Sequence, residues 1–219
     1  MKRKTILLIS VILANHFLAG CRPAPRKIDL TQHYNAHLDK GWHPKTNAAN
    51  TEDNSLAELP SGEQTFVNVA FDVRGLIQLS GKSLVGWGGN FPKEVTGIKV
   101  NGKCRRLHFL QGTGWQEPAG TTIGRYVIHY ANGQQQEIPI VYGEDVRDWW
   151  FWANEPQQSS RATLAWTGAN EASRKQGMSL RLYKSTWQNP FPNQEIQSID
   201  FVSVMSNCAP FLIAVTAEP

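Results

Sequence analysis

The chain has 219 residues, of which 22 are Lys or Arg and 18 are Asp or Glu, so its formal net charge is +4 at pH 7. Lys2, Arg3 and Lys4 precede the first apolar run, and the rest of the chain carries 19 basic against 18 acidic residues, or +1. This balance, without a basic stripe, argues against nucleic acid as a partner. No apolar stretch reaches the ~20 residues that a membrane-spanning helix needs.

The N-terminus has the pattern of an export signal. Basic residues 2–4 are followed by the apolar run 5–17 and then by small residues, as in a secretory signal peptide. The sequence Leu18-Ala19-Gly20-Cys21 resembles the lipobox of bacterial lipoproteins, in which the cysteine is acylated and becomes the mature N-terminus. We therefore expect a signal peptide at 1–20 and a lipid on Cys21 that holds the protein to an extracytoplasmic membrane surface of the cell envelope, such as the outer membrane. The alternative is an ordinary signal peptide with an incidental cysteine.

The next expected segment is a short tether. Residues 21–27 comprise the lipidated cysteine and a proline-rich stretch, a composition that stays extended. Six extended residues reach only ~20 Å, so the fold would sit close to the lipid. Residues 28–219 contain no linker-like segment and are expected to form one domain.

Short alternating apolar runs separated by turn residues predict about ten strands. The clearest unit is a hairpin in which Arg125–Ala131 and Gln134–Tyr142 flank Asn132-Gly133, a pair typical of type I′ turns. Pro139 removes one ladder donor and predicts an edge or a bulge there, and Thr31–Lys40 is expected to form a short helix. The other expected strands are Val67–Val73, Leu76–Leu79, Val95–Val100, Leu107–Leu110, Asp148–Trp152, Ala162–Trp166, Leu180–Lys184, Ile196–Val204 and Phe211–Thr216. This spacing predicts an all-β, two-sheet antiparallel β-sandwich.

A set of short sequence phrases carries a more specific resemblance. The phrases are Phe71–Gly75, Ile77–Leu79, Leu107–Thr113, Ile123–Tyr130, Ile138–Gly143, Val146–Trp150 and Thr186–Pro190. Together they resemble a β-sandwich domain of secreted or envelope-anchored bacterial proteins, sometimes found behind anti-sigma or FecR-like segments. That domain is similar to the galactose-binding-like jelly roll. The resemblance implies a jelly-roll fold over nearly all of 28–219 and implies little about function.

Tryptophans are the first candidates for ligand contacts. In a strand, Trp149 and Trp150 would point to opposite faces, and Trp152 would share the face of Trp150. A solvent-facing tryptophan offers a flat apolar platform for a sugar ring, whereas burial in the sandwich core is the alternative for each of them. Trp115, in the expected loop Gln111–Gly120, is the next place to seek such a platform.

Charged residues directly before these aromatics complete the candidate surface. Glu144, Asp145, Arg147 and Asp148 could hold sugar hydroxyls, because ionised partners make strong hydrogen bonds. The three carboxylates could also supply oxygen ligands to a structural Ca²⁺, although their spacing does not match an EF-hand loop. The alternative is a solvated turn with Arg–carboxylate pairs of little energetic value. No cofactor and no metal motif is expected.

Cys104 and Cys208 leave two readings open. In an oxidising compartment they can form a disulfide, and they can equally be two buried free thiols. Sequence alone does not test the geometry that a disulfide needs.

These observations favour a binding protein without enzymatic activity. The chain has no Gly-x-Ser-x-Gly elbow, no Walker loop and no dinucleotide fingerprint. We expect a lipid-anchored envelope protein that binds carbohydrate or envelope glycan. A structural or protein-interaction module of the envelope is the first alternative. A glycan hydrolase is the second, with an unrecognised carboxylate pair drawn from Glu94, Glu117, Glu144, Asp145 and Asp148.

Overall fold

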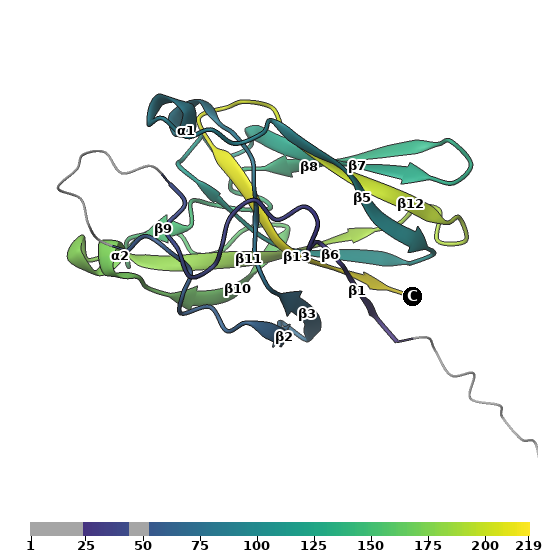
Figure 1. Ribbon diagram of the computed structural model, residues 1–219, viewed down its shortest axis with the longest axis horizontal. Helices are drawn as coiled ribbons and strands as arrows, with labels where there is room; N and C mark the ends of the chain where they lie inside the picture. The colour runs from purple at the N-terminus through teal and green to yellow at the C-terminus, as the bar shows by residue number, and fades with distance from the viewer. Residues whose placement is uncertain (1–23, 44–52) are drawn as a thin grey trace, which may run out of the picture.

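The computed structural model describes residues 24–43 and 53–219. It confirms an all-β sandwich, in which two antiparallel sheets face each other (Figure 1). The larger sheet contains, in spatial order, β1 (Arg26–Ile28), β13 (Ala209–Glu218), β6 (Arg106–Gly114), β11 (Ser179–Gln188) and β10 (Ala162–Gly168), with β4 (Ile77–Gln78) beside β13 and β9 (Trp150–Phe151) beside β11. The smaller sheet contains β5 (Glu94–Gly102), β12 (Ile196–Ser203), β7 (Thr122–Tyr130) and β8 (Gln135–Val141). The predictions for the signal peptide and for lipid on Cys21 lie outside the described residues.

The remaining elements are small. A separate hairpin joins β2 (Gly62–Phe66) to β3 (Val69–Val73), and two five-residue helices are α1 (Lys82–Gly86) and α2 (Glu171–Lys175). Within the described ranges, no helix has the length and apolar character required to cross a membrane.

The space between the two sheets holds the main core. Its centre is a stack of three rings, in which Tyr126 lies 4.0 Å from Phe109 and 5.1 Å from Phe201, measured between ring centroids. These rings belong to β6, β7 and β12, so they join the two sheets. Burying aromatic side chains of this size is a dominant stabilising contribution in a core.

A second core covers the opposite face of the larger sheet. Leu110, Leu182 and Phe211 pack there against residues of the N-terminal segments, such as Leu38 and Leu56. Figure 1 shows the β2–β3 hairpin on this side, away from the smaller sheet. The larger sheet is therefore buried on both faces, which explains why nine of the ten residues of β13 are buried.

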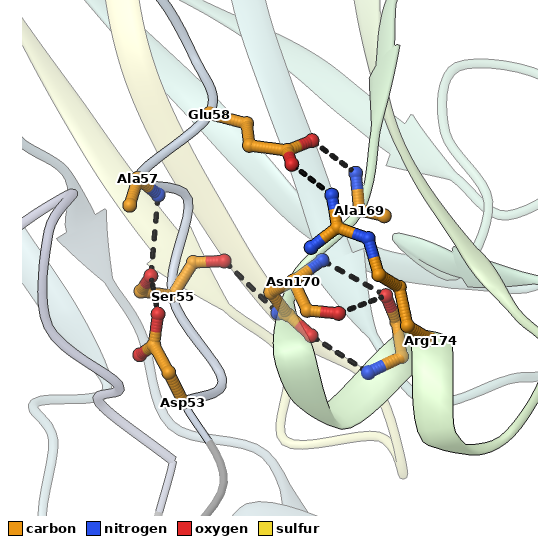
Figure 2. A network of polar contacts seen from close by, with 8 residues as sticks. Asp53, Ser55, Ala57, Glu58, Ala169, Asn170 and Arg174 are labelled. Carbon is orange, nitrogen blue, oxygen red and sulfur yellow. Dashed lines mark hydrogen bonds and ion pairs between the residues drawn. The ribbon is translucent and has the colours of Figure 1, made fainter.

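Polar contacts fasten the N-terminal segment to the sheet and to α2. The buried Gln78 side chain accepts a hydrogen bond from Trp42 Nε1 at 2.8 Å. Around α2, Asn170 caps the helix by accepting from Ser173 N at 2.7 Å and donates to Ser55 O at 2.9 Å (Figure 2). Glu58 pairs with Arg174 on the same helix. A side-chain cap of this kind stabilises a helix by about 1 kcal/mol.

The predicted β7–β8 hairpin is present, with a different turn. Val127 and His129 lie on the outer face while Ile128 and Tyr130 are buried, as the alternation predicts. Gly133 donates to Tyr130 O at 3.0 Å and has φ of +87°, whereas Asn132 is not among the residues with positive φ. The expected type I′ turn is therefore wrong, because that turn needs positive φ at both central residues. The loop is instead a three-residue connection in which only glycine takes the left-handed conformation.

Two predictions at the N-terminus are also wrong. Residues 31–40 form turns and a single bridge between Ala36 and Leu76, not a helix. Backbone groups of this segment make hydrogen bonds with Leu76, next to β4, and not within a helix. The fold begins at Arg26 and not at residue 28. Arg26 and Lys27 pair with Ala217 and Thr216 of β13, so these two residues belong to the sheet and not to the tether.

The edges of both sheets are interrupted. β8 is an edge strand of the smaller sheet, as Pro139 predicts, and β10, at the edge of the larger sheet, has a register irregularity between Leu164 and Trp166. The other edge of the smaller sheet, β5, pairs with two irregularities, and Gly97 N donates there to Asp200 Oδ1 at 2.8 Å. β1, at the other end of the larger sheet, has three residues.

Candidate functional site

The predicted ligand segment 144–152 lies in the long connection between β8 and β10, and its charged side chains are engaged by residues of that connection. Asp145 is buried and pairs with Arg161, whose Nε donates to Asp145 Oδ1 at 3.1 Å. Glu144 Oε2 lies 3.3 Å from Arg161 Nη1. Arg147 Nε donates to Gln158 O at 3.0 Å. These side chains therefore form internal pairs and do not make one shared ligand surface.

The Asp148 side chain has a partner within its own segment. Its Oδ1 accepts a hydrogen bond from Trp150 N at 3.3 Å. Among the described residues, no group of three or more His, Cys, Asp or Glu side chains is arranged to hold a metal ion, so the carboxylates of residues 144, 145 and 148 do not form the structural Ca²⁺ site that the sequence left open. Burial raises the pKa of Asp148 to about 7, because the charged form loses its hydration.

Arg181 of β11 organises the connection that carries this segment. Its side chain is 1% exposed and donates from Nε to Asp148 O at 2.7 Å and from Nη1 to Pro156 O at 2.9 Å. Its guanidinium also lies 4.7 Å from the centroid of the Phe151 ring and forms an ion pair with Glu155. A buried guanidinium that is this fully paired is a structural anchor for the loop.

The tryptophans of the segment divide between the core and the surface. Trp149 is 2% exposed and Trp150 is half-buried, and both pack with the second core. They do not face opposite sides of a strand, because β9 begins only at Trp150. Trp152 is 46% exposed, beyond the end of β9, and is the one member of this trio with a large free surface.

Trp115 belongs to an aromatic chain at one end of the sandwich. Its ring lies 5.6 Å from that of Trp87, which is 51% exposed, and 5.0 Å from that of His43. The His43 ring continues the chain to Trp149 at 5.7 Å. Trp115 is half-buried and has φ of +63°, which is rare for a bulky residue. Burial lowers the pKa of His43 to about 4, so this imidazole is neutral at pH 7.

Cys104 and Cys208 are free, buried thiols, so the disulfide reading is wrong. Cys208 directly precedes Ala209, which pairs with Gly114 at the C-terminal end of β6. Cys104 precedes the N-terminal end of the same strand. Nine residues of extended strand separate the two positions by ~30 Å, far beyond the reach of a disulfide. Burial raises the pKa of Cys208 to about 12 and that of Cys104 to about 11, so neither thiol is an activated nucleophile.

A pocket of about 220 Å³ opens between the two sheets at their β8 and β11 sides. We call it the lateral pocket. Its lining residues are Phe109, Gln111, Tyr126, Glu137, Ile138, Pro139, Ile140, Asp145, Arg161, Ser185, Thr186 and Trp187.

Strand lengths explain why the space stays open. β10 begins at Ala162, opposite Ser185, so the following residues of β11 have no β10 neighbour. Across the gap, β8 is an edge strand. The two sheets are therefore not closed by a further strand on this side, and the edge of the main core is accessible.

One wall of the lateral pocket is polar although it continues the sandwich core. Gln111 is the centre of this wall: it accepts from Tyr126 Oη at 2.7 Å and donates to Ser185 Oγ at 3.0 Å. Asp145 and Arg161 extend the wall toward the 142–146 turn. Isoleucines of β8, Phe109 and the half-buried Trp187 ring form the apolar part. The pocket thus combines apolar surface with a few fixed polar groups, as small-molecule sites do.

Sequence reasoning found Asp145 but missed most of its partners in the pocket. Arg161, Ser185 and Gln111 come from three distant parts of the chain, and only the pairing of β6 with β11 brings the last two together. Trp187 is one of the eight tryptophans of the chain and was not among the candidates chosen from the sequence. The alternation of β11 does carry a usable signal, since Tyr183, Ser185 and Trp187 share one face of that strand.

Comparisons with known proteins assign this chain to no family. No protein-family model matches the sequence, and no curated protein matches it significantly. The resemblance to envelope β-sandwich domains of the galactose-binding-like type stays a prediction, and the function has to be inferred from the site itself.

Proposed function

We propose that this protein is a lipid-anchored component of the bacterial cell envelope that binds carbohydrate in the lateral pocket and carries out no catalysis. The observation that supports this most directly is the composition of the pocket. A tryptophan and isoleucines lie beside a buried wall of amide, hydroxyl and charged groups. A sugar has the matching character, since its ring presents C–H surface and its rim presents hydroxyls that both donate and accept.

The polar wall of the lateral pocket includes side chains that are buried in the fold. Gln111, Ser185 and Asp145 are all buried, and placing polar groups there destabilises the fold unless they are hydrogen-bonded. Gln111 donates to Ser185 and accepts from Tyr126, and Asp145 accepts from Val141 N. The polar groups of the wall are therefore held in place before any ligand binds. Pre-organised polar groups of this kind give a site its specificity.

The same geometry favours binding over hydrolysis. A glycosidase needs two carboxylates ~5–9 Å apart across the bond that it cleaves, one of them free to donate a proton. Both oxygens of Asp145 are engaged, Oδ1 by Arg161 and Oδ2 by Val141 N at 2.8 Å. Glu137, the other carboxylate of the lining, forms an ion pair with Arg125 and is largely exposed. Neither group is placed as a proton donor over the pocket.

The alternative of a protein-interaction module has one observation in its favour. Val85 and Trp87, in and just after α1, are about half exposed. They lie beside the start of β13, whereas β1, the first strand of the described chain, pairs with the end of β13, so this apolar surface lies at the other end of that strand from β1. An exposed apolar patch is a feature of interaction sites.

A glycan array with the full-length protein, solubilised in mild detergent, tests the proposal. We expect binding to a restricted set of glycans, which Trp187→Leu weakens and Trp87→Leu leaves unchanged. If Trp87→Leu abolishes binding and Trp187→Leu does not, the site is the α1 end of the sandwich. If no glycan binds while the protein remains folded by circular dichroism, the carbohydrate proposal is rejected.

A further inference from the structure

The size of the lateral pocket limits what it can hold. Ligand pockets for drug-sized molecules have volumes of roughly 300–1,000 Å³. The lateral pocket has about 220 Å³, which suits one ring and not several. Its lining includes the stacked pair Phe109 and Tyr126, and both rings belong to the main core. A ligand in the pocket therefore lies between β8 and β11 and contacts the edge of the main core.

The charged side chains of the lining are held in ion pairs. Arg161 faces two carboxylates, those of Asp145 and Glu144, and Glu137 pairs with Arg125. A ligand with its own carboxylate would meet Asp145 and Glu144 beside Arg161, and like charges in close contact are unfavourable. A ligand amine would have to replace the guanidinium of Arg161, because both oxygens of Asp145 are already engaged by Arg161 and Val141 N. The lining therefore favours a neutral ligand.

The remaining hydrogen-bonding capacity lies together on the polar wall. Ser185 Oγ accepts from Gln111 Nε2, and among the described residues its own proton has no acceptor. Tyr126 Oη gives its proton to Gln111 Oε1 and keeps its lone pairs. One donor and one acceptor thus flank Gln111. Adjacent hydroxyls of a sugar can accept from Ser185 and donate to Tyr126, while the C–H surface of the ring lies against Ile138 and Trp187.

From these three observations we infer that the lateral pocket binds a single neutral sugar ring at the end of a glycan, by its free adjacent hydroxyls. This inference rests on the proposed carbohydrate function and specifies its ligand. Internal sugars of a chain should bind more weakly, because they are substituted on both sides and the pocket has room for one ring.

Titration of the full-length protein in detergent micelles with defined sugars tests the inference. The probes are methyl glycosides of neutral hexoses and 6-deoxyhexoses, their uronic-acid and amino-sugar counterparts, and the same neutral units placed inside a chain that is blocked at both ends. Binding is read by ligand-observed NMR and calorimetry. We expect at least one neutral methyl glycoside to bind, and its charged and chain-internal counterparts to bind at least tenfold more weakly.

Variants locate the binding site. Ser185→Ala removes the donor with little change in volume and should weaken binding of that glycoside about tenfold, as expected for a hydrogen bond worth ~1.4 kcal/mol. Ser198→Ala, on β12 and outside the pocket, is the matched control and should bind as the wild type does. Unchanged melting temperatures of both variants exclude misfolding as the cause.

Each other outcome has a definite meaning. Equal binding of terminal and chain-internal units overturns the single-ring inference and leaves the carbohydrate proposal standing. Preference for a charged sugar overturns the neutral specificity. Wild-type affinity of Ser185→Ala overturns the assignment to this wall. Binding of no sugar at all overturns both the inference and the proposed function.

Discussion

Replacing Asp148 with asparagine should stabilise the protein at neutral and alkaline pH. The carboxyl group lies against Trp150 and near Arg181, and burial raises its pKa from 3.8 to about 7. A carboxyl whose pKa is raised by folding favours the folded state while it is protonated. That advantage is lost as the pH rises from about 4 to about 7, because the unfolded chain ionises first. Above pH 7 the folded protein therefore carries the full penalty of an ionised, buried carboxylate.

The size of the effect follows from the two pKa values. Each pKa unit corresponds to ~1.4 kcal/mol, so a change of about three units sets an upper bound of about 4 kcal/mol. Asparagine keeps an oxygen that can accept from Trp150 N and removes the charge. We expect Asp148→Asn to raise the free energy of unfolding by about 2–4 kcal/mol at pH 8 and by less than about 1 kcal/mol at pH 4.

Urea unfolding of both proteins between pH 4 and pH 8.5 measures this difference directly. His43, whose pKa is lowered to about 4, destabilises the fold as the pH falls below 6.5, but it does so in both proteins and cancels from the comparison. Asp72→Asn is the matched control, because that carboxylate pairs with the exposed Arg74 and such surface pairs contribute about 0–1 kcal/mol. A stability difference for Asp148→Asn that does not change with pH would refute the reasoning.

Three further predictions concern the anchor, the loop and the tryptophans. Cys21→Ser should abolish incorporation of radiolabelled fatty acid, and equal labelling of the variant would contradict lipidation at this residue. Arg181→Leu should lower the free energy of unfolding by about 3–5 kcal/mol, because it leaves Glu155 without its buried partner, and urea unfolding checks this. Trp149→Ala should destabilise the fold by about 3–5 kcal/mol, whereas Trp152→Ala should change its stability by no more than about 0.5 kcal/mol; similar melting temperatures for the two variants would show that their burial is misassigned.

The sequence predicted the strands better than their surroundings. The β7–β8 hairpin, the edge position of Pro139 and the buried face of Ile128 all follow from alternation and turn chemistry, which are local properties. β2 was missed because Phe66 is its only large apolar residue and none of its five residues is fully buried. Local sequence patterns did not predict that both faces of the larger sheet are buried. Leu180 and Tyr183 face opposite sides of β11, and both are buried because separate parts of the chain cover each side.

The candidate site illustrates the same limit. Residues 144–152 were considered as one surface because they are adjacent in the chain. Their side chains separate because Arg161 and Arg181, which are distant in sequence, hold Asp145 and the Asp148 carbonyl in different places. Proximity along the chain therefore predicted a grouping of side chains that the structure does not show. The lateral pocket depends on where β10 begins relative to Ser185, and strand register across a sheet has no local signature.

The interrupted edges affect how copies of the protein can behave at high local density. Long, regular edge strands pair readily with those of another molecule and start aggregation. Proteins held on one membrane by lipid meet in two dimensions and in a restricted range of orientations, so their edges collide far more often than in free solution. Pro139 on β8, the irregular register of β10 and β5, and the shortness of β1 leave poor templates for such pairing. These features should allow the protein to be crowded on a membrane surface and remain monomeric.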